Sequence, residues 1–376
     1  MYSSKDEASR INTKLIARFF CQENMQALID HFADVIQDAS EHDFPVCIRG
    51  SGSKDFYGGE LQGKIVDIRD YAGIVEYDPR ELVLTARAGT PLKEINRVLS
   101  EAGQMLPFEP PHFGEGATLG GCVAAGLSGP RRAYTGAVRD YVLGLRMLDG
   151  EARDLRFGGQ VMKNVAGYDV SRLMTGSLGT LGLILEISLK VLPKPPGELT
   201  LEFAMNEAEA IHAMNAWAGQ PIPLSATVFH DGCLRVRLSG TGNALAAAHE
   251  KMGGQIVNEP EIYWQGLREQ SLPFFSESFS LWRISVPATT PPLPFSGAQQ
   301  IEWGGALRWL VSDEPDTTIR ARVAAAHGQA ILFRAAEKQR RKIFHPLAPG
   351  LMEIHRRLKL TFDPSGIFNP GRMYDF

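Results

Sequence analysis

Small residues are concentrated in one stretch of the chain, Pro110–Gly129, with the sequence PPHFGEGATLGGCVAAGLSG. Neither helices nor strands favour so many glycines in so short a span. Glycines allow a backbone to approach a ligand closely, and consecutive N–H groups form a concave nest that attracts anions such as a diphosphate. The stretch therefore predicts a ligand-binding loop, and cofactor binding is the first hypothesis.

A second glycine-rich loop, Arg49–Gly58, follows directly after the short apolar run Phe44–Ile48. A strand that leads into a tight loop is a common arrangement for gripping phosphate. Neither loop ends in the Gly-Lys-Ser/Thr of a Walker loop, and neither has the Gly-x-Gly-x-x-Gly spacing of a Rossmann βαβ unit. Either loop alone is equally compatible with an ordinary turn, but the two together favour a dinucleotide site of another type.

The composition is that of an ordinary soluble globular protein. The chain has 376 residues, of which 44% are hydrophobic and 22% charged, and its net charge is −4. This length allows two or three domains. No run of lysine and arginine is dense enough to follow a nucleic-acid backbone, and no segment is suited to a signal peptide or a membrane span. We therefore expect a cytoplasmic chain with no nucleic-acid partner and no direct membrane insertion.

The four cysteines, Cys21, Cys47, Cys122 and Cys233, include no Cys-x-x-Cys pair. Thiolates alone therefore cannot hold zinc or an iron–sulfur cluster here, and if electrons leave this protein, another subunit must take them. Cys122 follows two glycines, where the N–H groups of a helix start could lower the pKa of its thiol. The alternative is that this small residue fills tight space against a ligand.

Apolar periodicity predicts mixed helices and strands in the first half of the chain. A helix over 25–43 leads into the first strand, and a second helix opens at Pro91 and closes at Gly103. The runs 142–148 and 151–155 predict two strands joined by an Asp149-Gly150 hairpin turn. Further strands are expected over 64–68, 73–77, 82–88 and 183–192.

The proline cluster Pro193–Gly197 marks the first domain boundary, because it cannot continue a sheet ladder and forms a stiff linker. Beyond it the pattern is β-α-β-β-α-β, the split-βαβ plan, and a weaker second round follows. The first round comprises strands over 199–205, 225–230, 233–238 and 255–257 and helices over 207–218 and 244–252. The second comprises strands over 280–286, 300–303, 306–311 and 330–334 and a helix over 319–327.

The C-terminal part of the chain predicts a helix followed by an ordered tail. The helix covers Pro349–Leu358, with Leu351, Ile354 and Leu358 on one face. The tail, Phe362–Arg372, is rich in turn residues. So rigid a segment is expected to pack on the rest of the molecule.

Taken in this order, the segments resemble the FAD-binding flavoproteins of the vanillyl-alcohol oxidase (PCMH) type and, among them, the FAD-binding accessory subunits of bacterial glycolate oxidases. The resemblance covers nearly the whole chain. It implies an α+β fold with a two-subdomain FAD-binding domain over 1–195, a ferredoxin-like cap domain over 196–340, and a segment over 341–376 that returns to the FAD. It rests on Arg49–Gly58, Pro110–Gly114, Ala117–Gly121, Val138–Asp140, Lys163–Asp169, Gly176–Gly182 and Asp363–Gly371.

The resemblance also implies where FAD is held. Backbone N–H groups of Gly50–Ser53 and Thr118–Gly121 would hold the pyrophosphate, and Gly182–Ile184 would lie near the adenine or ribose. Gly126, Ser128 and Gly129 would lie along the ribityl chain and the flavin edge. Asn369 and Arg372 are candidates for the polar rim of the flavin, with a solvated or salt-bridged arginine as the alternative for Arg372. The expected FAD-binding residues are Arg49, Gly50, Ser51, Gly52, Ser53, Thr118, Leu119, Gly120, Gly121, Gly126, Ser128, Gly129, Gly182, Ile184 and Asn369.

Departures from the family pattern limit the chemistry. Many members attach the flavin through a histidine where this chain has Ser53, so we expect non-covalent FAD. Related hydroxy-acid dehydrogenases have a glutamate where this chain has Leu178, and a His-x-x-x-His-Gly metal cluster that this sequence lacks, so no metal site is expected. Oxidation of a 2-hydroxy acid also needs a base. The catalytic residue stays unassigned, and the candidate bases are His112, His345, His355 and Tyr168.

The leading hypothesis is an FAD-binding subunit of a multi-subunit glycolate (2-hydroxy acid) dehydrogenase or oxidase. It would support or relay electron transfer beside a catalytic flavoprotein and an iron–sulfur subunit, and it would reach the inner membrane only through these partners. The alternatives are a self-sufficient FAD-dependent 2-hydroxy-acid dehydrogenase and a scaffold that has lost FAD. An obligate subunit should expose an apolar patch. The candidates for it, which could equally form the core of the cap, are Trp264, Phe274, Phe275, Phe279 and Trp282.

Overall fold

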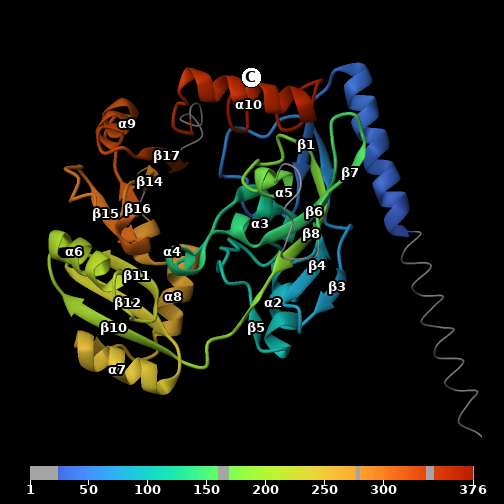
Figure 1. Ribbon diagram of the computed structural model, residues 1–376. Coiled ribbons are helices and arrows are strands. Elements are labelled where there is room, and N and C mark those ends of the chain that lie inside the picture. The colour runs from blue at the N-terminus through green and yellow to red at the C-terminus, as the bar shows by residue number, and fades with distance from the viewer. Residues whose placement is uncertain (1–23, 160–168, 277–279, 336–342, 376) are drawn as a thin grey trace, which may run out of the picture.

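The computed structural model describes residues 24–159, 169–276, 280–335 and 343–375. Figure 1 shows two lobes, each built around a sheet. The first lobe is coloured blue to green, and the second, which we call the cap, is coloured yellow to orange. Helix α10 (Pro349–Phe362), in red, lies across the top of the view.

The first lobe contains a five-stranded sheet of order β3-β4-β8-β6-β7 and a separate parallel pair, β1 and β2. Its core contains Ile36 of the first helix, Ile95 of α2 and Leu185 of β8, all fully buried. The elements are a helix over 24–42, β1 (Val46–Arg49), β2 (Lys64–Asp67), β3 (Ile74–Asp78), β4 (Val83–Arg87), α2 (Leu92–Glu101), β5 (Gln104–Met105), α3 (Leu119–Ala125), α4 (Arg132–Thr135), η1 (Val138–Asp140), β6 (Val142–Leu148), β7 (Asp154–Gly158), α5 (Val170–Met174), β8 (Leu183–Lys190) and β9 (Leu192–Pro193).

The cap contains an eight-stranded sheet of order β13-β10-β12-β11-β15-β16-β14-β17. Its helices and strands follow the expected pattern closely, and α6 covers the predicted residues. The elements are β10 (Glu198–Ala204), α6 (Glu207–Ala218), β11 (Leu224–His230), β12 (Cys233–Ser239), α7 (Gly242–Met252), β13 (Gln255–Ile256), α8 (Pro260–Glu269), η2 (Pro273–Ser276), β14 (Leu281–Ser285), β15 (Ala298–Glu302), η3 (Trp303–Gly305), β16 (Leu307–Val311), α9 (Asp316–Ala325) and β17 (Gln329–Arg334).

The cap sheet consists of two halves with the same strand order. Numbered along the chain, the four strands β10 to β13 lie in the order 4-1-3-2, which is the ferredoxin-like arrangement. The strands β14 to β17 repeat this order in reverse, and the two halves join edge to edge through β11 and β15. Both predicted rounds are therefore confirmed. The limits of the three domains stay a prediction.

The two faces of the cap sheet have different surroundings. In the second half, Trp282, Ile284 and Leu310 pack under α9, whereas Trp309 and Phe333 face the first lobe. The expected exposed patch is absent at the described candidates, because Trp264, Phe274, Phe275 and Trp282 are all buried. They form cap core instead; Phe279 lies outside the described residues.

Two local predictions are wrong. The strands β6 and β7 are joined by a five-residue loop, not by the two residues Asp149 and Gly150. The cause is the buried Asp149 carboxylate, which accepts hydrogen bonds from the N–H groups of Glu151 and Arg153 and holds the loop in place. In addition, Pro193 itself belongs to a sheet ladder: it is the last residue of β9 and is paired with Gln104 of β5.

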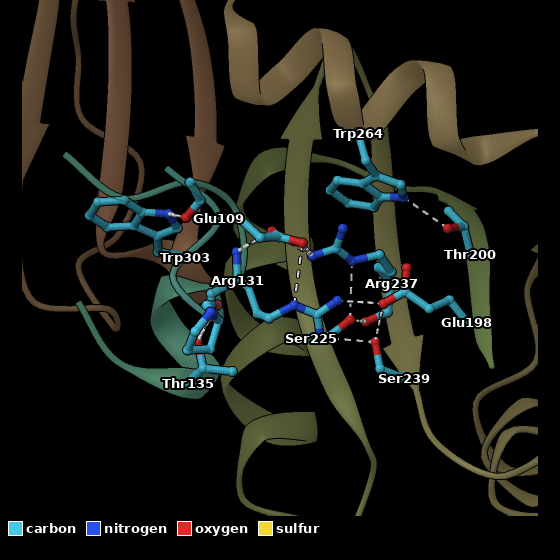
Figure 2. A network of polar contacts seen from close by, with 12 residues as sticks. Glu109, Arg131, Thr135, Glu198, Thr200, Ser225, Arg237, Ser239, Trp264 and Trp303 are labelled. Carbon is cyan, nitrogen blue, oxygen red and sulfur yellow. Dashed lines mark hydrogen bonds and ion pairs between the residues drawn. The ribbon is translucent and has the colours of Figure 1, made fainter. Parts of the chain in front are cut away.

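A buried ionic network fixes the cap on the first lobe (Figure 2). Glu109 of the first lobe accepts hydrogen bonds from Arg237 of β12, at 2.8 Å, and from Arg131, at 3.3 Å. Arg131 is also paired with Glu198 of β10 and donates to Ser239. Burial alone would raise the pKa of Glu109, but the two guanidinium groups lower it below its usual value. These contacts therefore hold the cap in a fixed position relative to the first lobe.

Candidate cofactor cleft and a cavity beneath the cap

A cleft in the first lobe collects most of the residues expected to bind a cofactor. It encloses about 770 Å³ including the part open to solvent. We call it the cofactor cleft. Its lining includes Arg49, Gly50, Ser51, Gly52, Ser53, Lys54, Ala88, Thr118, Gly120, Gly121, Ala125, Leu178, Gly182, Ile184, Asn369 and Arg372.

The two glycine-rich loops approach each other closely at this cleft. A Cβ added to Gly50 would lie 2.5 Å from Thr118 Oγ1, and one added to Gly116 would lie 3.1 Å from the Cβ of Ser51. Residues separated by more than sixty positions thus lie side by side. This convergence is the arrangement that the sequence predicts for a site holding one dinucleotide.

The loop after β1 provides unused main-chain donors. Within the described part of the chain, no hydrogen bond uses the N–H groups of Gly50, Ser51 or Gly52. Three successive N–H groups at the end of a strand form a nest for an anion. The loop is held in shape by Arg49, whose guanidinium is paired with Asp55 at 2.6 Å. These residues fit the diphosphate of a dinucleotide.

In the second loop, the N–H groups of Leu119, Gly120 and Gly121 are used inside the protein, while the expectation for the Thr118 N–H stays a prediction. The N–H groups of Leu119 and Gly120 already donate to the carbonyl oxygens of Thr90 and Ala88, at 2.9 and 2.7 Å. The N–H of Gly121 donates to Thr118 Oγ1, which caps helix α3. Because these donors are used inside the protein, the role left to the segment is close approach of small residues to the ligand.

Four expected residues do not line the cofactor cleft. Leu119 is fully buried in the core of the first lobe. Gly126 packs against Gly176, since an added Cβ would lie 2.9 Å from the Cα of that glycine. Ser128 and Gly129 line a second cavity, between the first lobe and the cap. Their assignment to the flavin edge stays a prediction.

The C-terminal tail returns to the cofactor cleft and is anchored there by Asn369. Its side-chain oxygen accepts from Ile48 N–H at 2.8 Å, and its side-chain nitrogen donates to the carbonyl of Leu178 at 2.7 Å. Arg372 is buried and donates to the carbonyl oxygens of Lys54 and Asp55. Its buried guanidinium therefore supports the loop after β1.

Lys54 is a residue of the cofactor cleft that the sequence predictions missed. Its ammonium group donates to the carbonyl of His112 at 3.1 Å and lies over the ring of Phe113, and burial lowers its pKa. It is adjacent to Ser53, so a positive charge lies beside that position. In the sequence, Lys54 stands out as a charged residue that directly follows the four small residues Gly50–Ser53.

None of the candidate bases within the described residues lines the cofactor cleft or the cavity under the cap. The pKa values of His112, His345 and His355 are all lowered, chiefly by burial. Tyr168 lies outside the described residues. Burial raises the pKa of the Cys122 thiol to about 11, and Cys122 lies in the core of the first lobe, which favours a packing role over a reactive thiol.

The second cavity, which we call the cap cavity, lies between the loop 111–130 and the cap sheet. It encloses about 360 Å³ including its open part. On the cap side its lining consists of large side chains, some of them charged, whereas many of the residues that line the cofactor cleft are small. The lining includes Phe113, Ser128, Gly129, Arg268, Gln270, Arg283, Glu302, Trp303, Trp309 and Phe333.

Contacts between the first lobe and the cap surround the cap cavity. Trp303 donates a hydrogen bond from its indole to the carbonyl of Gly129 at 3.0 Å. The Glu269 carboxylate of α8 accepts from the N–H groups of His112 and Phe113 at 3.0 and 2.9 Å. The cap thus holds the Pro110–Gly129 loop by its main chain. No group of histidine, cysteine and carboxylate side chains suited to a metal ion occurs in the described ranges.

Comparisons with known proteins agree with this geometry. A family model described as an FAD binding domain matches residues 27–158. Glycolate oxidase subunit GlcE of Escherichia coli (strain K12) is 49% identical over 349 residues, which cover 93% of this chain and 97% of that protein. Glycolate oxidase subunit GlcD of Bacillus subtilis (strain 168) is 33% identical over 175 residues, 46% of this chain and 37% of that protein.

A solved structure supports the same fold. The chain superposes on 4-ethylphenol oxidase from Gulosibacter chungangensis with a TM-score of 0.68, over 92% of this chain and 88% of that one, at 12% identity. Because the match to the Escherichia coli protein spans nearly all of both chains, this chain belongs to the family of FAD-binding flavoproteins that contains glycolate oxidase subunit GlcE.

Proposed function

We propose that this chain is the FAD-binding subunit of a multi-subunit glycolate (2-hydroxy acid) dehydrogenase or oxidase. One observation carries the proposal: the two glycine-rich loops and the C-terminal tail line a single cleft in a chain that matches glycolate oxidase subunit GlcE over 97% of that protein's length. The subunit supports or relays electron transfer beside a catalytic flavoprotein and an iron–sulfur partner. FAD, when bound, supplies the acceptor for hydride or electrons.

Different residues of the cofactor cleft hold different parts of FAD. The N–H groups of Gly50, Ser51 and Gly52 bind the diphosphate, and Gly120 and Gly121 allow its close approach. The adenine or ribose lies toward Gly182 and Ile184, which line the same cleft, and Asn369 and Lys54 lie toward the flavin. The Lys54 ammonium would favour the anionic reduced flavin electrostatically. The FAD is non-covalent, since Ser53 offers no imidazole for attachment.

We propose that electrons collected on FAD pass to another protein of the complex. The described residues contain no cluster of histidine, cysteine and carboxylate side chains suited to a metal ion. None of the described helices has the length and apolar character needed to cross a membrane. We propose a cytoplasmic complex that reaches the inner membrane only through its partners.

A second candidate function is a self-sufficient FAD-dependent dehydrogenase of 2-hydroxy acids. One observation favours it: charged side chains line the cap cavity next to the FAD-binding lobe. A scaffold that has lost FAD is less well supported, because the cofactor cleft keeps its unused N–H donors and the small residues that leave room for a ligand.

Purification of the tagged chain from its native cells tests the proposal. The copurifying proteins are identified by mass spectrometry, and the flavin is released by acid and typed as FAD or FMN. The proposed subunit releases FAD and retains a second flavoprotein and an iron–sulfur protein. A yellow preparation that purifies alone and is bleached by glycolate indicates the self-sufficient enzyme. A colourless preparation that takes up no FAD indicates the scaffold.

A further inference from the structure

Arg334 of the cap lies against three phenylalanine rings. It is the last residue of β17, and the Cζ atom of its guanidinium lies 4.8 Å from the ring centroid of Phe56 and 5.5 Å from those of Phe113 and Phe333. All three distances fall within the separation of about 6 Å at which an aromatic ring attracts a cation. We call Arg334 and these three rings the aromatic clamp.

The rings of the aromatic clamp come from three segments that are far apart in the sequence. Phe56 belongs to the loop after β1, Phe113 to the Pro110–Gly129 loop and Phe333 to β17. The ring centroid of Phe56 lies 5.4 Å from that of Phe113 and 5.4 Å from that of Phe333, with the ring planes 71° and 70° apart. Edge-to-face pairs of this kind are favourable beyond the burial of their surface. The aromatic clamp therefore joins both glycine-rich loops to the cap.

The aromatic rings take the place of an ionic partner for Arg334. Within the described residues, burial alone lowers its pKa, to about 10, and no carboxylate acts against this effect. A buried cation that no carboxylate neutralises needs another source of stabilisation. The negative faces of the rings supply it, so the position of Arg334 and the positions of the rings depend on one another.

Phe56 lies inside the turns that shape the loop after β1. On one side of it, the N–H of Asp55 donates to the carbonyl of Gly52 at 3.0 Å; on the other, the N–H of Tyr57 donates to the carbonyl of Lys54 at 3.0 Å. The same loop carries the unused N–H donors that fit a diphosphate. A displacement of the Phe56 ring is therefore transmitted to the part of the loop that faces the cofactor.

Phe113 connects the aromatic clamp to Lys54, which lines the cofactor cleft. The ammonium of Lys54 lies 5.6 Å from the ring centroid of Phe113 and donates to the carbonyl of His112 at 3.1 Å. The main-chain N–H of Phe113 donates to Glu269 of the cap at 2.9 Å. One ring thus contacts a cation that lines the cleft and a cation that belongs to the cap.

We infer that Arg334 is a positioning residue for FAD: it holds Phe56 and Phe113, and through them the two glycine-rich loops, in the arrangement that binds the cofactor. FAD affinity then depends on a cap residue that does not itself line the cofactor cleft. The inference rests on the proposed function in one respect, since it takes FAD as the ligand of the cleft.

The affinity of Arg334 variants for FAD tests this inference. FAD-loaded full-length protein is diluted in steps, and the fluorescence of the released flavin gives the dissociation constant. Arg334→Met keeps an unbranched apolar side chain but loses the charge, so we expect FAD to bind about ten-fold more weakly. Arg334→Lys keeps the charge and should restore part of the affinity, which a role in packing alone would not do. Equal dissociation constants for wild type and Arg334→Met overturn the inference.

Arg322→Met is the matched control. Arg322 of α9 also lies over a phenylalanine ring, that of Phe295 at 5.3 Å, but it is paired with Glu314 at 2.8 Å, and both partners belong to the cap. This variant should bind FAD as tightly as the wild type. A loss of affinity as large as that of Arg334→Met would be a general effect of changes in the cap, and it overturns the inference.

Phe56→Leu tests whether Arg334 acts through the rings. It removes one ring of the aromatic clamp and should also weaken FAD binding. In the double variant with Arg334→Met, the loss of affinity should be smaller than the product of the two single losses, because both changes remove the same contact. Losses that multiply overturn the inference. If Arg334→Met does not fold, Phe56→Leu decides alone, and unchanged FAD affinity in it overturns the inference.

The FAD content of the wild type separates this inference from the proposed function. A wild-type protein that holds no FAD contradicts the proposed function itself. A wild-type protein that holds FAD and its partners, together with unchanged FAD affinity in Arg334→Met, overturns only the role of Arg334.

Discussion

The cofactor cleft is lined largely by main chain and small side chains, whereas the cap cavity is lined by Trp303, Trp309, Phe333 and charged side chains of β14, β15 and α8. In the cleft, Arg49 has an ionic partner and Arg372 supports the loop through its hydrogen bonds to carbonyls. The unsatisfied groups there are N–H donors. A long, charged molecule that needs close contact along its length fits such a surface.

In the cap cavity the unsatisfied groups are side chains. Arg283 forms no close ion pair within the described part of the molecule, although its charge and the carboxyl group of Glu302 attract each other, and the side-chain oxygen of Gln270 has no donor. The cavity is also smaller, about 360 Å³ against about 770 Å³. The difference indicates that one site is built for a large ligand held by the backbone and the other for a small ligand held by a few polar side chains.

The largest effect should come from filling the cofactor cleft at Gly121. A Cβ added to Gly121 would lie 3.2 Å from Thr118 Oγ1, so this hydroxyl must shift by a few tenths of an ångström, and the branches of a valine enter the cleft that Gly121 lines. We expect Gly121→Val to lose nearly all bound FAD while keeping its far-ultraviolet circular dichroism. The measurement is the ratio of flavin absorbance to protein after gel filtration.

Gly242→Val is the matched control for this change. Gly242 lies in the first turn of α7 in the cap, and nothing lies within 4 Å of an added Cβ. It should retain FAD at the wild-type ratio. Full FAD occupancy in Gly121→Val would show that the cleft does not hold the cofactor, and the contrast between the two cavities would lose its basis.

The second largest effect should come from the network that holds the cap above the first lobe. Glu109→Gln removes the charge that lies between Arg131 and Arg237 and leaves two buried guanidinium groups without it. Breaking a buried pair in this way costs about 3–5 kcal/mol. Urea unfolding at neutral pH measures the loss, and limited proteolysis between the lobes should become faster.

Glu101→Gln is the control, since Glu101 forms an exposed pair with Arg97 on α2. Exposed pairs contribute about 0–1 kcal/mol, so this variant should unfold with nearly the wild-type midpoint. If Glu109→Gln unfolds no earlier than Glu101→Gln, the network does not hold the lobes together, and the cap cavity is not a fixed site.

The cofactor cleft could be predicted from the sequence because its signals are local. A run of glycines indicates where the backbone approaches a ligand closely, and each of the two loops shows this signal within a few residues. The elements of the cap were also predictable, since their apolar periodicities are regular, as α6 shows. What failed locally was the Asp149 loop, where a buried carboxylate overrides the turn preference of Asp-Gly.

The cap cavity could not be predicted, because it depends on pairings between distant strands. Arg283, Glu302 and Gln270 become neighbours only through the register of β14, β15 and β16 and the position of α8. Nothing in the sequence shows that Arg283 forms no close ion pair within the described residues. For the same reason the donors of Leu119 and Gly120 were assigned to a ligand, although distant carbonyl groups already accept them.

A smaller effect, dependent on pH, should appear at Glu302. Burial raises its pKa from 4.5 to about 7, against the lowering influence of Trp309, Gln300 and Arg283; Tyr263 also faces it. Because the folded state binds this proton more tightly than the unfolded state, the stabilisation is full below pH 4.5 and is lost as pH rises through 7. The loss amounts to about 3 kcal/mol.

Glu302→Gln should remove this pH dependence. The amide stays neutral and keeps an oxygen for Trp309, so the variant should be more stable than wild type at pH 8 and similar to it near pH 5. Urea unfolding at several pH values between 5 and 8 gives the two slopes. Glu353→Gln, on the exposed side of α10, serves as the control. Identical slopes for wild type and Glu302→Gln would mean that Glu302 is charged in the folded protein at neutral pH.

The smallest effect should come from the anchor of the C-terminal tail at the cofactor cleft. Asn369 has a positive φ of 40°, which glycine adopts without strain, so Asn369→Gly removes the side-chain contacts to Ile48 and Leu178 alone. Leaving these buried groups unpaired costs about 1–3 kcal/mol, and FAD should bind more weakly because the tail lines the cleft. Asn206→Gly, at the start of α6 in the cap, should cost only a few tenths of a kcal/mol and leave FAD affinity unchanged. If both variants bind FAD equally well, the tail closes the first lobe without contributing to the cofactor site, and the cleft depends on its two glycine-rich loops alone.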